Sequence, residues 1–192
     1  INFAADGNTD TSHMTSFDGS SVTLTGSDGS IAIIGASSAG ATIATGAGND
    51  FVVGGDGNDT ITTGAGDDII TGGLGADMLT GGSGSDTFMY AGAAESTGVN
   101  VDTITDFTSG SDAINLGNLL LSGSFVGNAA GFVAAQTALT GGGTQDAVFD
   151  TQTHQLYVDV NGDGVIGGGD MVITLTGVTG LTNDGSHTDV QF

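Results

Sequence analysis

Residues 45–89 read TGAGNDFVV GGDGNDTIT TGAGDDIIT GGLGADMLT GGSGSDTFM, five nine-residue repeats that follow one another without an insertion. Glycine occupies the second and fourth positions of every repeat (Gly46, Gly48, Gly55, Gly57, Gly64, Gly66, Gly73, Gly75, Gly82 and Gly84). The sixth position is always aspartate (Asp50, Asp59, Asp68, Asp77 and Asp86), and the eighth is always large and apolar (Val52, Ile61, Ile70, Leu79 and Phe88). A flexible Gly/Asp linker would not keep three residue types in register, so the stretch predicts an ordered repeating structure.

The residue types indicate what each part of the repeat does. Glycine lets the backbone turn through conformations that a side chain forbids, which brings carbonyl oxygens close to a common point. The aspartate adds a hard anionic oxygen there, and such oxygens suit Ca²⁺ better than a soft transition metal. The next three residues favour a strand whose middle side chain points opposite to its neighbours. Each repeat therefore predicts a three-residue strand with one inward side chain, and a loop of oxygen ligands at the edge.

This pattern resembles the GGxGxDxUx repeat of the RTX family, whose calcium β-roll is a right-handed parallel β-helix. The resemblance implies an all-β fold with two repeats per turn, strands on two opposing faces, and Ca²⁺ between loops n and n+2. Asp50 and Asp68 would then flank one site, Asp59 and Asp77 a second, and Asp68 and Asp86 a third. The paired glycines of these loops would contribute carbonyl oxygens.

Charge is the strongest feature of the composition. The 192 residues include 22 acidic residues and no Lys or Arg, which gives a net charge of −22. Such self-repulsion opposes compaction unless counterions bind, and it argues against nucleic acid or an anionic membrane as a partner. Cysteine is absent, which excludes disulfides and thiolate metal sites, and no apolar run is long enough for a membrane-spanning helix. The chain begins at Ile1, and we expect it to be a processed or truncated piece of a longer protein.

Three regions are expected along the chain. Residues 1–44 predict degenerate solenoid turns in which the extended frame places Ile34 and Ile43 inward, and residues 45–90 form the calcium β-roll. Residues 91–192 predict a β-rich cap with one short helix. The expected elements of this cap are a helix at Asn128–Leu139 with Asn128 as its N-cap, a hairpin of Ala147–Asp150 and Gln155–Val160, and a strand at Met171–Val178.

A second candidate metal site follows the hairpin, where residues 159–170 read DVNGDGVIGGGD. The spacing matches an EF-hand calcium loop, except that Asp170 replaces the usual Glu at the last position. Asp159, Asn161 and Asp163 would supply side-chain oxygens, and Val165 would supply its carbonyl. The alternative is a Gly/Asp-rich turn between strands. The flanking strands argue against a sensor with paired helices, so we predict a structural calcium site.

The segment after the repeats, DTITDF at 102–107 followed by GSDAINL at 110–116, resembles the closing segment of β-rolls in secreted RTX proteases. In that family, aspartates at the positions of Asp102 and Asp106 help to hold a terminal calcium; ordinary turn residues are the alternative. The end of the chain, LTNDGSHTDVQF at 181–192, looks like a type I secretion signal. Together these imply recognition by the type I secretion machinery and a secreted, extracellular or cell-surface location in a Gram-negative bacterium.

The sequence contains neither the HExxH motif of zinc proteases nor the GxSxG motif of lipases, so we do not expect an enzyme. We favour a calcium-binding structural protein that self-assembles as a homo-oligomer or polymer into a surface layer or filament. In this it resembles the C-terminal part of Caulobacter-type S-layer proteins. The alternatives are the C-terminal secretion and folding module of a large RTX adhesin, or of a secreted protease or lipase. The apolar outward face with Phe51, Val53 and Ile69 is the expected contact surface.

Overall fold

The computed structural model describes residues 14–17, 21–23, 32–37, 39–119, 121, 123–139, 145–183 and 187–192. Its first strands are β1 (Met14–Phe17), β2 (Ser21–Thr23), β3 (Ala32–Ser37), β4 (Thr42–Ala44), β5 (Phe51–Asp56), β6 (Thr60–Ala65), β7 (Ile69–Leu74), β8 (Met78–Ser83) and β9 (Thr87–Met89). Then follow the 3₁₀ turn η1 (Ala93–Glu95), β10 (Asp102–Ile104), β11 (Ala113–Asn115), η2 (Gly117–Leu119), β12 (Phe125–Ala129) and helix α1 (Phe132–Leu139). The last strands are β13 (Ala147–Asp150), β14 (Gln155–Val158), β15 (Met171–Leu175) and β16 (Val190–Gln191).

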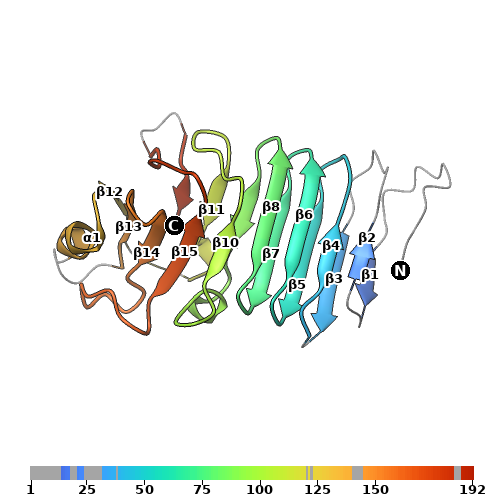
Figure 1. Cartoon of the computed structure of the whole chain (residues 1–192), viewed down its shortest axis with the longest axis horizontal. Helices are drawn as coiled ribbons and strands as arrows, with labels where there is room; N and C mark the ends of the chain where they lie inside the picture. Colours follow the sequence, from blue (N-terminus) through green and yellow to red (C-terminus); the bar gives the residue numbers. More distant parts are fainter. Residues whose placement is uncertain are drawn as a thin grey trace.

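These strands form two sheets that face each other along the long axis of the molecule (Figure 1). Among the described residues, one sheet has the order β1-β3-β5-β7-β9-β11-β16, and the other has the order β12-β13-β14-β15-β10-β8-β6-β4-β2. Successive repeats alternate between the sheets, and all pairs within the repeat region are parallel, as in Val52 with Ile70 and Ile61 with Leu79. The predicted all-β parallel β-roll with two repeats per turn is confirmed.

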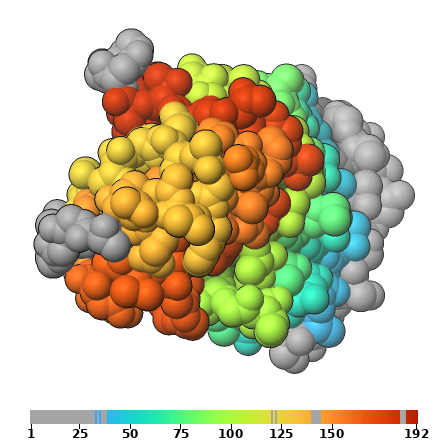
Figure 2. Space-filling model, turned by 60° about the vertical axis from the view of Figure 1, so that its left-hand side comes forward, coloured from blue at the N-terminus to red at the C-terminus, as the bar shows by residue number. Residues whose placement is uncertain are grey.

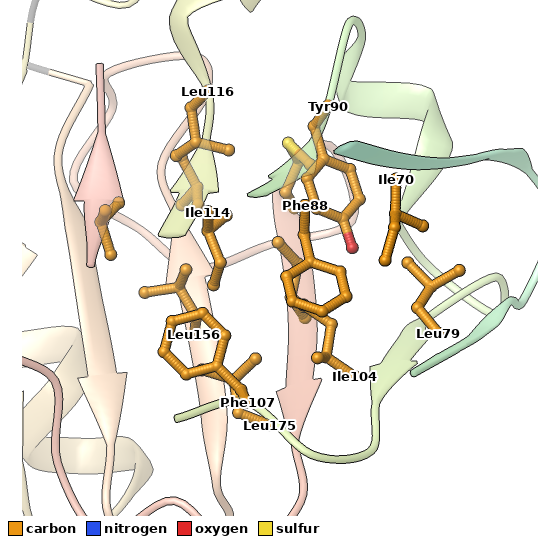
Figure 3. Close-up of a cluster of buried hydrophobic side chains, with 14 of the residues drawn as sticks. Ile70, Leu79, Phe88, Tyr90, Ile104, Phe107, Ile114, Leu116, Leu156 and Leu175 are labelled. Carbon is orange, nitrogen blue, oxygen red and sulfur yellow. The ribbon is translucent and has the colours of Figure 1, made fainter. Parts of the chain in front are cut away.

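The core is a column of one large apolar side chain per half-turn. Val52, Ile61, Ile70 and Phe88 are fully buried, and Leu79 is 1% exposed. Each contributes about 2 kcal/mol of stabilisation by leaving water, so the column holds the two sheets together. At the C-terminal end the column widens into a cluster that includes Tyr90, Ile104, Phe107, Ile114, Leu116, Leu156 and Leu175 (Figure 3).

The strands of the repeat region are longer than predicted. β5, β6, β7 and β8 have six residues each, because the extended backbone continues through the first positions of the next repeat. Gly55 pairs with Gly73 and Gly64 pairs with Gly82, so the glycine pairs belong to the ladder before the chain turns. The first residue of a repeat can also point inward: Thr63 is fully buried, and its hydroxyl donates to the carbonyl of Gly81 at 2.8 Å.

The described part of residues 14–44 continues the same two sheets, with one difference in register. Ile33, not Ile34, pairs with Val52 and is fully buried, because β3 contains an extra residue between its pairings with β5. The position opposite Val52 that was predicted for Ile34 is therefore occupied by Ile33. Ile43 pairs with Ile61 and is 1% exposed, as expected for an inward side chain.

The cap extends one sheet with an antiparallel meander. β13 pairs with β14 and β14 with β15, which confirms the predicted hairpin, and β15 joins β10 in parallel. Helix α1 packs on this end and buries Ala135 and Leu139 against Val148 and Tyr157. Figure 2 shows this end of the molecule from outside. No helix among the described residues is both long and apolar enough to cross a membrane.

Two expectations for the cap were wrong in detail. The helix begins at Phe132, and Asn128 lies in β12, where its amide exchanges hydrogen bonds with the backbone of Leu181 at 2.8 and 3.0 Å. The side-chain amide of Asn128 is therefore used for contacts with Leu181 and does not cap the helix. At the C-terminal end, for which no strand was predicted, β16 pairs with β11, and Asp189 is fully buried, with Ser109 Oγ donating to its carboxylate at 2.6 Å.

Because the glycines of successive turns lie so close together, we predict that one added methyl group lowers the stability of the fold strongly. Gly73 has φ +107°, and a Cβ there would lie 1.9 Å from the carbonyl oxygen of Gly55 in the preceding turn. We expect Gly73→Ala to lower the free energy of unfolding at saturating calcium by about 3 kcal/mol or more. Gly92→Ala is the control, because its φ is −154° and the nearest atom to a Cβ there is 4.0 Å away. Equal urea midpoints for the two variants would contradict this account.

Candidate metal centres

The repeat aspartates form two ladders, one along each edge of the β-roll. On one edge the backbone N–H of Asp50 donates to Asp68 Oδ1 at 2.7 Å, and that of Asp68 donates to Asp86 Oδ1 at 3.0 Å. On the other edge the N–H of Asp59 donates to Asp77 Oδ1 at 2.8 Å. The structure thus brings together the three aspartate pairs that the RTX resemblance implied.

Both ladders continue beyond the last repeat. The N–H of Asp77 donates to Asp102 Oδ1 at 2.9 Å, and the N–H of Asp86 donates to Asp112 Oδ1 at 3.0 Å. Asp112 was missed in the sequence, although a signal was present. It precedes the buried Ile114 by two residues, as each sixth-position aspartate precedes its inward residue. An Asp-x-Ile search outside the nine-residue frame would have found it.

Asp102 and Asp106 do not lie at one site. Asp102 begins β10 beside Asp77, whereas Asp106 follows β10 at the opposite edge. There the carboxylate of Asp106 accepts the N–H groups of Gly81 at 3.0 Å and Gly82 at 2.7 Å. Two ions, one at each edge, would be needed to use both residues.

The second carboxylate oxygen of these aspartates is the main clue to a ligand. Oδ2 of Asp59, Asp68, Asp77 and Asp86 is buried and has no hydrogen-bond partner among the described residues. The side chains are at most 2% exposed. A buried carboxylate oxygen without a partner is costly, and this chain has no Lys or Arg to neutralise it. A hard divalent cation fits such oxygens.

Burial also changes the acidity of the ladders. It raises the pKa of Asp77 and of Asp86 from 3.8 to about 6, although backbone N–H groups that donate to them act in the opposite direction. Burial raises the pKa of Asp102 to about 8, with the charge of Asp77 adding to the shift. The pKa of Asp59 is raised for the same main reason. Without a metal, Asp77, Asp86 and Asp102 therefore keep their protons to a higher pH than a free aspartate does.

Backbone oxygens would complete any coordination sphere. In the described part of the chain, no three Asp, Glu or His side chains gather at one point as a metal-binding cluster. The aspartates lie in pairs, so the carbonyl groups of the glycine loops would have to supply the remaining ligands. These loops do bring carbonyls close to the next turn: a Cβ on Gly82 would lie 1.9 Å from Gly64 O. Calcium accepts six to eight oxygens, backbone carbonyls included.

In the loop from Asp159 to Asp170, backbone N–H groups hold the side-chain oxygens of the predicted ligands in place. Asp159 accepts the N–H of Gly162 and of Gly164, each at 2.7 Å, and these glycines have φ +71° and +73°. Asp163 Oδ1 accepts the N–H of Val165 at 2.8 Å, and Asn161 Oδ1 accepts the N–H of Asp163 at 2.8 Å.

Asp170 closes this loop and is nearly fully buried, at 1% exposed. Its carboxylate accepts the N–H of Val160 at 3.1 Å and of Gly167 at 2.7 Å. Burial raises its pKa, and the charges of Asp159 and Asp163 add to the shift. This donor set of carboxylate and amide oxygens suits Ca²⁺.

The raised pKa values predict that the metal-free chain loses stability as the pH rises. Folded Asp77, Asp86 and Asp102 keep protons that the unfolded chain releases near pH 3.8. Their contribution is fully present below that pH and is lost as the pH rises through about 6 and then about 8. Urea unfolding in chelator at several pH values measures this slope. Asp102→Asn should flatten the upper part of the slope selectively, and an unchanged slope would contradict the assignment.

One comparison with known proteins identifies a family for this chain, and another finds no match. The family model described as Peptidase M10 serralysin C terminal matches residues 3–185. A comparison with curated protein sequences finds no match.

Two solved structures are similar to the chain, both subunits of the mannuronan C5-epimerase from Azotobacter vinelandii. AlgE6R3 is 25% identical over 77% of this chain and 72% of its own, with a TM-score of 0.40. AlgE6R2 is 22% identical over 89% of this chain and 92% of its own, with a TM-score of 0.45. The family match spans nearly the whole sequence. The chain therefore belongs to the family of serralysin C-terminal domains, the non-catalytic RTX-type β-roll of type I secreted proteins.

Proposed function

We propose that this protein is an extracellular calcium-binding structural module that folds on Ca²⁺ after type I secretion from a Gram-negative bacterium. The observation that carries the proposal is the buried Oδ2 atoms of Asp59, Asp68, Asp77 and Asp86, which have no hydrogen-bond partner in the described part of a chain that lacks Lys and Arg. Catalysis has no part in it, because each dense aspartate group is accounted for by calcium.

The ladders indicate which residues would hold the ions. The pairs are Asp50 with Asp68, Asp59 with Asp77, Asp68 with Asp86, Asp77 with Asp102 and Asp86 with Asp112, together with carbonyls of the glycine loops. Asp106 would add its charge to the last pair, since its charge contributes to the raised pKa of Asp86. The loop of Asp159, Asn161, Asp163, Val165 and Asp170 would form a separate site in the cap.

Calcium would couple to folding through charge. The aspartates of one edge stack on each other in successive turns, and their mutual repulsion opposes the fold until cations enter. Because the unfolded chain has no formed site, the free energy of binding becomes free energy of folding. In a low-calcium cytosol the chain would stay loose enough for export. Millimolar calcium outside the cell suffices for sites of the weak extracellular class.

Asp68 is the sharpest test of the ladder, because it belongs to two of the pairs. We expect Asp68→Asn to lower the number of bound Ca²⁺ ions by about two and to raise the calcium concentration needed for folding. Calorimetry gives the stoichiometry, and circular dichroism during a calcium titration gives the folding midpoint. Asp67→Asn is the matched control: it removes the same charge from the adjacent, exposed residue. Identical stoichiometries for the two variants would overturn the ladder as the calcium site.

A second candidate function is assembly into a surface layer or filament through an outward sheet face. On β5 and β7, Phe51 and Val53 are only half-buried, and Ile69 is 39% exposed. Phe51 pairs with Ile69 across the two strands, and Val53 follows two residues later on β5, so the three side chains are neighbours on one face of the sheet. Burial of these side chains against a second copy would favour association. The family match supports the alternative, a secretion and folding module of a larger adhesin, protease or lipase.

Light scattering with electron microscopy during a calcium titration distinguishes these readings. If the chain assembles, ordered particles should grow as calcium is added and dissolve with chelator. Ile69→Asn should suppress growth, whereas Val99→Asn, at a residue 94% exposed and outside the sheets, should not. A calcium-saturated chain that stays monomeric would leave only the module reading.

A further inference from the structure

Helix α1 reaches the loop of residues 159–170 through one side chain. Gln136, on the loop-facing side of the helix, donates from Nε2 to the carbonyl of Gly164 at 2.6 Å. Its Oε1 accepts the N–H of Ile166 at 2.8 Å. The oxygen and the nitrogen of one side-chain amide thus bind the two residues that flank Val165. The backbone of a neighbouring β-strand would make the same two hydrogen bonds.

These two hydrogen bonds decide where the peptide groups of Val165 point. The peptide bonds are trans, so the carbonyl of Val165 lies opposite to the N–H of Ile166 across one planar unit. Because that N–H points to Gln136, the Val165 carbonyl points away from the helix. The N–H of Val165 also points away from the helix, and it donates to Asp163 Oδ1 at 2.8 Å. The carbonyl is therefore held on the side of the loop that carries Asp163.

The remaining contacts of α1 are modest. The helix has eight residues, too few to be stable alone in water. Ala135 and Leu139 are buried, and the ring of Phe132 meets that of Tyr157 edge-on with centroids 5.7 Å apart, but Phe132 is still 47% exposed and Val133 is 78% exposed. A short helix anchored by two buried side chains should respond to a change in the loop that it is bonded to.

We propose that Gln136 is the positioning residue of this loop: it holds the Val165 carbonyl toward the bound ion and couples occupancy of the loop to helix α1. The inference rests on the calcium site proposed above for residues 159–170. Coupling of this kind is reciprocal, so calcium should order the helix to the extent that the helix favours calcium binding.

The first test is the affinity of the loop for calcium, measured by calorimetry on the full chain. Asp163→Ala identifies the loop site as the binding step that this variant loses. Gln136→Met keeps the volume but removes both hydrogen bonds, and we expect it to weaken that step about tenfold while the β-roll steps stay unchanged. Gln152→Met is the matched control, because Gln152 lies exposed in the turn between β13 and β14.

The second test is hydrogen exchange of residues 132–139 at two calcium concentrations, one that fills the β-roll steps alone and one that also fills the loop step. Filling the loop should increase protection of this helix in the unmodified chain and in Gln152→Met, but not in Gln136→Met or Asp163→Ala. A response of the helix to the second concentration that persists in Gln136→Met, or a loop affinity unchanged there, would overturn the role of Gln136. If Gln136→Met loses the helix already at the lower concentration, Asp163→Ala decides alone: a persisting response of the helix would overturn the coupling. An Asp163→Ala chain that binds as many ions as the original would instead refute the loop site.

Discussion

The hydrogen bond from one aspartate's amide to the carboxylate of the aspartate one turn further on is the interaction on which the structure depends. It recurs along both edges, and it ties the spacing of the turns to the position of the charges. In Asp59, Asp68, Asp77 and Asp86, one carboxylate oxygen accepts a backbone N–H, and the other is buried without a hydrogen-bond partner among the described residues, where a cation would fit. The aspartate of each repeat therefore both connects successive turns and creates the place for a cation.

This arrangement explains why the composition is so one-sided. A Lys or Arg near the ladders could neutralise an aspartate permanently, and folding would then need less calcium. Without any such residue, neutralisation of the ladders would have to come from ions in the surroundings, whose concentrations differ between the inside and the outside of a cell. The glycines allow the turns to stack this closely, since a Cβ at Gly73 or Gly82 would collide with the preceding turn.

The cap solves a different problem, the end of the solenoid. β10 and β11 continue the two sheets without the nine-residue repeat, and β15 and β16 then pair with them. Asp102 and Asp112 extend the ladders into this region, so the last complete repeats keep the partner that they need. Around them, Tyr90 and Phe107 fill the wider core, and burial raises the pKa of Tyr90 well above its usual value (Figure 3). The antiparallel strands and α1 cover the end of the sheet.

The sequence by itself determined the repeating unit of strand and loop, because a strict nine-residue period allows only one set of inward and outward positions. The two-repeat turn and the aspartate pairs followed from the resemblance to the RTX family. The hairpin of Ala147–Asp150 and the strand from Met171 followed from local alternation. Only the tertiary structure decided what depends on distant partners. The bulge in β3 turns Ile33 inward, Leu181 draws Asn128 into a strand, and two opposite edges separate Asp102 from Asp106. Asp112 and Gln136 gain their roles in the same manner, since no local pattern specifies a contact made across the fold.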